Sequence, residues 1–222
     1  MTSDLSAADL EILRARLSGV AVEMGAVLRR SASSPNIKER ADCSAAVFTP
    51  AGELLAQAEH IPVHLGAMPA SVAAVIDALG PSLGPGEQAI VNDPFAGGSH
   101  INDVTVVAPC FDGGRLIGWV ANRAHHADLG GAAPGSMPAD ATDIHQEGLR
   151  LPPIRLTDDV RRVVVAASRT PEERAGDLDA QIGSNRLGVA RLAELAGSPF
   201  AAVVDHGQRL AEAAVRSAPD GR

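Results

Sequence analysis

Apolar residues recur every three or four positions from Ser6 to about Arg30, a spacing that predicts an amphipathic helix. Ser6 is a candidate N-cap, and Asp9 and Glu11 add negative charge to the first turn. The stretch from Ser31 to Pro35 should end this helix, because a proline pushes the residue before it out of the helical conformation.

The same spacing predicts three further helices. The first covers 69–79 and should stop at the Gly-Pro pair that follows it. The second begins after Thr170, a cap residue with proline at the first helical position, and continues to Leu195. The last helix follows Pro199.

Short apolar runs between turn residues predict strands. The expected strands cover 44–49, 54–56, 89–91, 104–111, 115–120 and 163–166. The first two should form a hairpin around a Pro/Gly turn, and the two glycines after Asp112 should reverse the chain between the fourth and the fifth. The segment from Leu129 to Pro153 is rich in Gly, Pro, Ala and Asp and predicts a long loop, and loops of that length are usually functional or disordered.

Together these elements predict a mixed α/β fold: an antiparallel-rich sheet with flanking helices and a helical C-terminal extension. We expect a mixed α/β domain over 1–168, which would carry any metal site, and a helical extension over 169–222. A chain of 222 residues is long enough to bury a substantial hydrophobic core.

Charge and composition exclude several function classes. The chain has 19 basic and 27 acidic side chains and only 2% aromatic residues, which argues against a nucleic-acid partner. We see no leader and no apolar run near the roughly 20 residues of a membrane span, and therefore expect a cytoplasmic protein with no membrane segment. Cys43 and Cys110 lie far apart and suggest neither a disulfide scaffold nor a thiolate zinc site, and Cys110 is more typical of a buried core thiol than of a nucleophile.

Candidate chemistry is concentrated in the histidines. Six of the seven lie in predicted loops or at strand ends: His60, His64, His100, His125, His126 and His145. His100 and Asp103 share a glycine-supported turn, and the hairpin that reverses near Gly113 would bring His125 opposite Asp103. Imidazole and carboxylate groups placed together are typical ligands of a divalent metal.

Several roles remain open on these residues alone. Adjacent strand residues point to opposite faces, so one of His125 and His126 should face a metal while the other could act as acid, base or supporting partner. The alternative is that the histidines are ordinary hydrogen-bonded residues of a loop-rich surface. By position alone, Asp42 is better interpreted as a solvated charge before the first strand. Glu147 could be a general base, although an exposed loop glutamate is the commoner case.

Other catalytic motifs are not found. The segment 93–98 has neither the lysine nor the following helix of a phosphate loop, so we predict no nucleotide site in this chain. The sequence contains no GxSxG motif, and Ser136 lies in a predicted loop with no base assigned to it.

Six blocks of sequence, in order, resemble the hydantoinase B/oxoprolinase family. They are SPNIKER (34–40), AEHIPVHLG (58–66), NDPFAGGSHIND (92–103), RAHHADLGG (123–131), PGSMP (134–138) and QEGLR (146–150). The resemblance implies a B-type subunit of an ATP-dependent hydrolase of small cyclic amides such as hydantoins, 5-oxoproline and lactams. It also implies an A-type partner subunit that uses the ATP, and metal-assisted hydrolysis in the B-type subunit.

The same resemblance implies a site. The ligands of a divalent metal (Zn, Mn or Fe) would be Asp42, His100, Asp103 and His125, and His126 and Asp128 would lie next to them. His126 or Glu147 would then handle the proton.

Family subunits are usually more than twice as long as this chain, so the resemblance covers only their N-terminal part. A second polypeptide would then supply the remainder. Four alternatives stay open: a subunit of an ATP-dependent ketone carboxylase, a non-catalytic assembly module, a truncated remnant or, ranked lowest, a free-standing metallohydrolase that hydrolyses a lactam without ATP.

Overall fold

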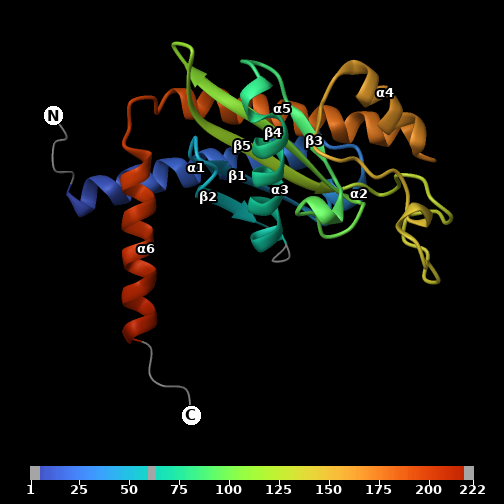
Figure 1. The fold of residues 1–222 in the computed structure, drawn as a ribbon, viewed down its shortest axis with the longest axis horizontal. Helices are drawn as coiled ribbons and strands as arrows, with labels where there is room; N and C mark the ends of the chain where they lie inside the picture. The colour runs from blue at the N-terminus through green and yellow to red at the C-terminus, as the bar shows by residue number, and fades with distance from the viewer. Residues whose placement is uncertain (1–5, 60–63, 218–222) are drawn as a thin grey trace.

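A six-stranded sheet with helices on both of its faces forms the body of the protein (Figure 1). The computed structural model describes residues 6–59 and 64–217. The strands are β1 (Cys43–Phe48), β2 (Leu54–Glu59), β3 (Ala89–Val91), β4 (Asp103–Asp112), β5 (Arg115–His125) and β6 (Ile154–Arg155). Their order is β2-β1-β5-β4-β3-β6, and every neighbouring pair is antiparallel. The predicted mixed α/β fold with an antiparallel sheet is confirmed.

The helices divide between the two faces of the sheet. They are α1 (Ala7–Ser31), α2 (Pro35–Lys38), α3 (His64–Leu79), α4 (Asp158–Ala167), α5 (Pro171–Ala193) and α6 (Phe200–Ser217). Trp119 and Ala121 of β5 pack toward α3, whereas Val120, between them, packs toward α1 and α5. Because side chains alternate along a regular strand, this register assigns the residues from Gly118 to His125 to a face; the irregularity opposite Cys110 and Phe111 shifts the alternation before Gly118.

The first helix forms as its sequence predicts. Ser6 accepts a hydrogen bond from the Asp9 backbone N–H, and the Asp9 carboxylate accepts one in return, which completes a capping box. The helix ends at Ser31, and the proline that was expected to stop it opens the short helix α2 at Pro35.

Two predicted elements differ from the structure. The expected strand over 163–166 is helical, because Thr157 caps α4 and the four-residue spacing of Val160 and Val164 turns both toward the core. The expected helix over 69–79 begins earlier, at His64, and therefore contains Pro69. The loop predicted before it covered 60–64; its last residue, His64, is the first residue of α3, and 60–63 lie outside the described residues.

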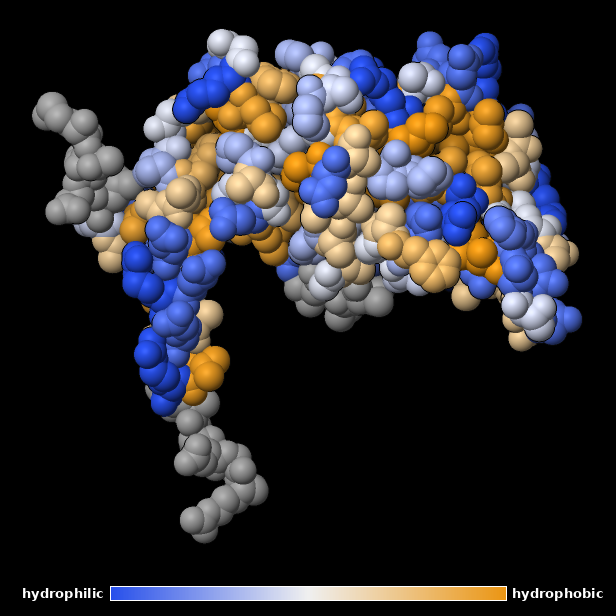
Figure 2. Space-filling model, viewed as in Figure 1, coloured by the Kyte–Doolittle hydropathy of each residue, from blue (hydrophilic) through white to orange (hydrophobic). Residues whose placement is uncertain are grey.

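The C-terminal helices lie differently from each other. α5 runs beside α1 across the sheet and buries Leu178 and Leu192, so residues after 168 contribute to the core. α6 packs its first turns through Phe200 and Val203 and then projects away from the body (Figure 1). Apolar residues are visible near its far end (Figure 2), and Val215 is 76% exposed there. No helix within 6–59 and 64–217 combines the length and the apolar character needed to cross a membrane.

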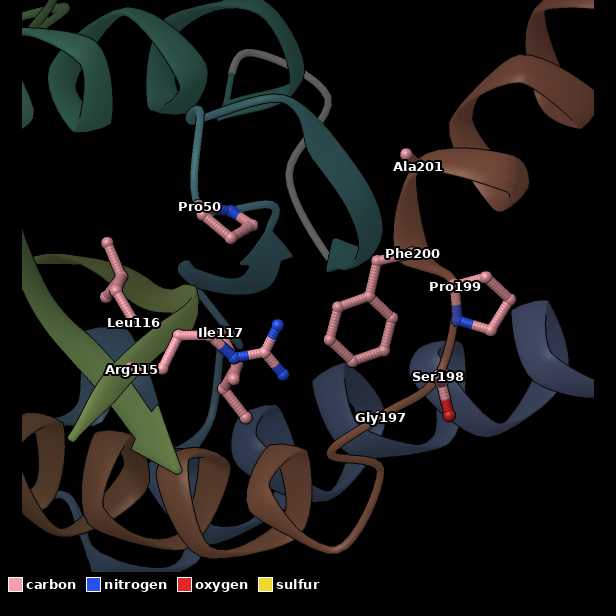
Figure 3. A pocket seen from close by; sticks show the side chains of 9 residues that line it. All are labelled: Pro50, Arg115, Leu116, Ile117, Gly197, Ser198, Pro199, Phe200 and Ala201. Carbon is pink, nitrogen blue, oxygen red and sulfur yellow. The ribbon is translucent and has the colours of Figure 1, made fainter. Parts of the chain in front are cut away.

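A hollow of about 260 Å³ lies where β5 begins (Figure 3). Pro50 of the β1–β2 turn, Arg115 at the start of β5 and Phe200 at the start of α6 are among the residues that line it. The chemistry-bearing residues predicted from the sequence are not in this hollow, because the strand end that carries His125 is at the opposite end of β5.

Candidate metal centre

Histidines and aspartates from different parts of the chain meet at one end of the sheet, on the face covered by α3. Asp42 immediately precedes β1, Asp103 opens β4 and His125 closes β5. β4 and β5 pair with Asp103 directly opposite His125, which confirms the pairing expected from the hairpin. His100 lies in the turn before β4, three residues from Asp103.

The predicted ligand atoms are close together. The Oδ1 atom of Asp103 is 3.5 Å from His100 Nε2 and 3.5 Å from His125 Nδ1. The two rings approach to 3.1 Å between His100 Nε2 and His125 Nδ1. Asp42 Oδ2 is 3.8 Å from His125 Nδ1. The structure therefore brings all four residues into one cluster.

A fifth residue, His64, also belongs to this cluster, although the sequence predicted only that it lies in a loop. Its Nε2 atom is 3.6 Å from Asp103 Oδ2 and 3.9 Å from Asp42 Oδ1. Its other ring nitrogen, Nδ1, is 2.9 Å from the hydroxyl of Ser44 on β1. The only sequence signal for His64 is its place in the block AEHIPVHLG, because the contact depends on how α3 packs on the sheet.

The charge and the burial of the cluster residues favour the binding of a cation. Burial alone would raise the pKa of Asp103, but the nearby rings of His125 and His64 and the hydrogen bond from Ser99 outweigh it and hold this pKa well below its ordinary value. Asp103 is therefore ionised at neutral pH. Burial lowers the pKa of His100 despite the nearby Asp103 carboxylate, which favours the neutral ring that binds metals.

The residues present fit a divalent metal. Asp103 Oδ1 and His64 Nε2 are both buried and have no hydrogen-bond partner, and unpaired buried polar atoms are rare in native proteins. The ligand atoms of His100, Asp103 and His125 lie within 4.8 Å of one another. A mixed imidazole and carboxylate set suits Zn, Mn or Fe.

His126 lies on the other face of the sheet. Its Nε2 atom is 2.8 Å from Gln181 Oε1 on α5, and its side chain is fully buried. Burial, and then the positive charge of Arg174, lower the pKa of His126 to about 3. The structure therefore does not bring His126 into the cluster, because adjacent strand residues point in opposite directions.

Asp128 immediately precedes the loop predicted from Leu129 to Pro153, and Glu147 lies within that loop. Asp128 accepts hydrogen bonds from the backbone N–H groups of Gly130, Gly135 and Arg169, so it holds the loop in shape. Glu147 follows a short 3-10 helix and is half-buried. Among the described residues, its side chain makes no hydrogen bond or ion pair with the cluster.

Comparisons with known proteins agree with this architecture. The 5-oxoprolinase 1 of Arabidopsis thaliana is 38% identical over 204 residues, which cover 84% of this chain and 16% of the plant protein. The caprolactamase subunit beta of Pseudomonas jessenii is 30% identical over an alignment of 226 residues. The alignment covers 96% of this chain and 39% of that subunit. The chain thus spans well under half the length of these relatives.

A solved structure has the same fold. The crystal structure of the ATP-dependent caprolactamase from Pseudomonas jessenii matches with a TM-score of 0.89 and 30% sequence identity, over 99% of this chain and 40% of that one. The sequence profile of the hydantoinase B/oxoprolinase family matches residues 6–221. The chain belongs to the hydantoinase B/oxoprolinase family.

Proposed function

We propose that this chain is the metal-binding part of the B-type subunit of an ATP-dependent hydrolase of small cyclic amides, of the hydantoinase, 5-oxoprolinase or lactamase type. The observation that carries this proposal is the convergence of three imidazoles and two carboxylates at one end of the sheet, where two buried atoms, Asp103 Oδ1 and His64 Nε2, have no hydrogen bond. Such a group costs stability unless it binds something, because buried polar atoms without a hydrogen bond are unfavourable.

The relatives support the reaction class and the need for a partner. One relative is named as the beta subunit of a caprolactamase, and a matching structure is titled as an ATP-dependent caprolactamase. By analogy, an A-type subunit would use the ATP and activate the substrate. This chain spans 39% of the caprolactamase subunit, and the proposed enzyme includes the part of a B-type subunit that corresponds to the remainder.

The residues of the cluster would divide the work. Asp42, His64, His100, Asp103 and His125 would hold the cation, and Ser44 would keep the His64 ring oriented through its 2.9 Å contact to Nδ1. When bound, a divalent cation polarises a carbonyl and lowers the pKa of water. Ser99 donates a hydrogen bond to Asp103 and so restrains that carboxylate.

His126 and Glu147 are the candidates for proton transfer. We assign this role to Glu147, because a carboxylate on a half-buried loop can approach a substrate. His126 would serve instead to anchor the end of β5 to α5, through its contact with Gln181.

The first test is the metal content of the purified chain, measured by inductively coupled plasma mass spectrometry. We expect about one equivalent of Zn, Mn or Fe per chain, and its loss in His100→Ala and Asp103→Ala. His145→Ala is the matched control, because this exposed histidine lies outside the cluster and its loss should leave the metal in place. A chain that stays metal-free after reconstitution with each ion would contradict the proposal.

The second test is activity in the assembled complex. We expect hydrolysis of hydantoin, 5-oxoproline or caprolactam only when an A-type subunit, ATP and the remaining part of the B-type subunit are present. Glu147→Gln should lower kcat by about 10²- to 10⁴-fold while the metal content stays unchanged. Unchanged kcat in this variant would remove Glu147 from the mechanism and leave the metal centre standing.

A further inference from the structure

Arg123 lies two residues before His125 on β5 and therefore points to the same face of the sheet. Its side chain is fully buried. No carboxylate of the described part of the chain is within ion-pair distance of it. Burying a guanidinium without a carboxylate partner costs free energy of folding, so the presence of Arg123 at this position needs a physical explanation.

The guanidinium of Arg123 makes four hydrogen bonds. Its Nε donates to the Thr105 hydroxyl at 2.8 Å. Its Nη2 donates to the Ser71 hydroxyl at 2.7 Å, and to the carbonyl oxygens of Ala67 and Gly97 at 3.3 Å each. The planar, rigid guanidinium is suited to joining several acceptors in a fixed geometry, which a lysine ammonium cannot reproduce.

Each of these acceptors belongs to a segment that carries a cluster residue. Thr105 is two residues beyond Asp103 on β4, and Gly97 is three residues before His100. Ala67 and Ser71 lie on α3, the helix that begins at His64. Arg123 itself shares β5 with His125. One side chain thus connects the four segments that contribute His64, His100, Asp103 and His125.

We propose that Arg123 is a positioning residue that sets the spacing of the metal ligands by tying α3, the turn before β4, and β4 to β5. This inference rests on the proposed metal centre. It extends that proposal to a residue that touches neither the metal nor the substrate.

The hydrogen-bond balance of Arg123 supports a positioning role over a purely stabilising one. Its Nη1 is buried and has no hydrogen-bond partner, so the fold does not use the full capacity of the group. Replacement of Arg123 leaves its four acceptors without their donor, so the Arg123 variants should also lose some stability. The metal affinity and the Co²⁺ spectrum of the folded variants separate positioning of the ligands from stabilisation of the fold.

The experiment compares Arg123→Lys, Arg123→Met and Ser71→Ala with the unchanged 222-residue chain. Ser71→Ala removes a single hydrogen bond of the guanidinium and is the variant least expected to impair folding. Asn122→Ala is the matched control: Asn122 is the next residue on β5, is equally buried, and donates two 2.8 Å hydrogen bonds to Gln181 and Asn185 on the opposite face.

Three quantities are measured for each protein: the Tm of the metal-free form, the Kd for Mn²⁺ or Zn²⁺ by calorimetry, and the visible spectrum of the Co²⁺-loaded form. We expect the Arg123 variants to weaken metal binding by about 10- to 100-fold and to change the Co²⁺ spectrum, as replacements of groups that orient ligands do. Ser71→Ala should change the Kd and the Co²⁺ spectrum in the same direction, but less than the Arg123 variants do. Asn122→Ala should lower Tm without changing Kd or the spectrum.

The outcomes separate the two proposals. If the unchanged chain binds no metal, the metal centre is wrong and the role of Arg123 falls with it. If the unchanged chain binds metal and the folded Arg123 and Ser71 variants keep its Kd and spectrum, the positioning role alone is wrong. If the Arg123 variants do not fold, an unaltered Kd and Co²⁺ spectrum in Ser71→Ala would contradict the positioning role.

Discussion

His125 and His126 are neighbours at the end of β5, yet their side chains enter different layers of the molecule. His125 meets the aspartates under α3, and His126 meets Gln181 of α5. The sequence predicted that only one of the pair would face a metal, because strand side chains alternate. Which one depended on the register of β4 and β5, which places Asp103 opposite His125.

At the scale of single residues, Ser44→Ala tests the orientation of His64. Removing the hydroxyl frees the Nδ1 side of the ring, and we expect about 10- to 100-fold weaker metal binding by calorimetry. Ser82→Ala is the control, because the Ser82 hydroxyl donates to the carbonyl of Leu79, in the turn that ends α3. Equal affinity in the two variants would contradict the role of Ser44.

The two thiols should be inert in the folded protein. Burial raises the pKa of Cys110 to about 11 and that of Cys43 to about 12. At pH 8 the thiolate fraction of Cys110 is then about 10⁻³, and the thiolate is the reactive form. We expect Ellman's reagent to react with both cysteines only after unfolding. Rapid reaction of the native chain would contradict the burial of the two thiols.

The same shifts set the direction of an alkaline effect on stability. A thiol whose pKa is raised by folding keeps its proton when the unfolded chain has already lost it. The free energy of unfolding should therefore fall as pH rises above the ordinary thiol pKa of 9.0. Urea titrations of the unchanged chain and of Cys110→Ala at pH 7.5 and 10 measure this; the loss should be smaller in the variant.

At the scale of elements, the approach of α3 to the turn before β4 decides whether the cluster forms. Gly97 has φ +85°, and a Cβ there would lie 2.4 Å from the backbone of Ala70 and Ser71 on α3. The helix and the turn can therefore meet only over a glycine. This contact also brings the carbonyl of Gly97 to Arg123.

Gly97→Ala should push α3 away from that turn. Gly86→Ala is the matched control, because Gly86 has φ +82° with open space around it and would suffer the backbone strain alone. We expect Gly97→Ala to cost at least ~1 kcal/mol more in the free energy of unfolding, since overpacking adds to the strain. Its metal affinity should also fall, and equal losses in the two variants would contradict the close contact.

At the scale of the whole molecule, α6 belongs to the core only at its beginning. Phe200 is buried against α1 and the sheet, while Val215 is 76% exposed on the projecting part. Phe200→Ala should lower the free energy of unfolding by ~3–5 kcal/mol, as removal of a core phenylalanine does. Val215→Ala should change it by less than ~0.5 kcal/mol, and urea denaturation measures both.

Features that depend on neighbours along the chain could be predicted from the sequence alone. The capping box of α1, the β1–β2 and β4–β5 hairpins, and the placing of His125 opposite Asp103 all follow from local spacing and turn residues. His100, Asp103 and His125 could be grouped for this reason, because a hairpin converts sequence distance directly into pairing.

The remaining features depend on contacts between segments far apart in the sequence. The valines of 163–166 carry strand propensity, but the spacing of Val160 and Val164 lets a helix bury both, and packing outweighs propensity. Asp42 and His64 reach the cluster only because β1 pairs with β5 and α3 lies over the sheet. The four hydrogen bonds of Arg123 join segments far apart in sequence, and no local pattern encodes such contacts, because they form only when the layers pack.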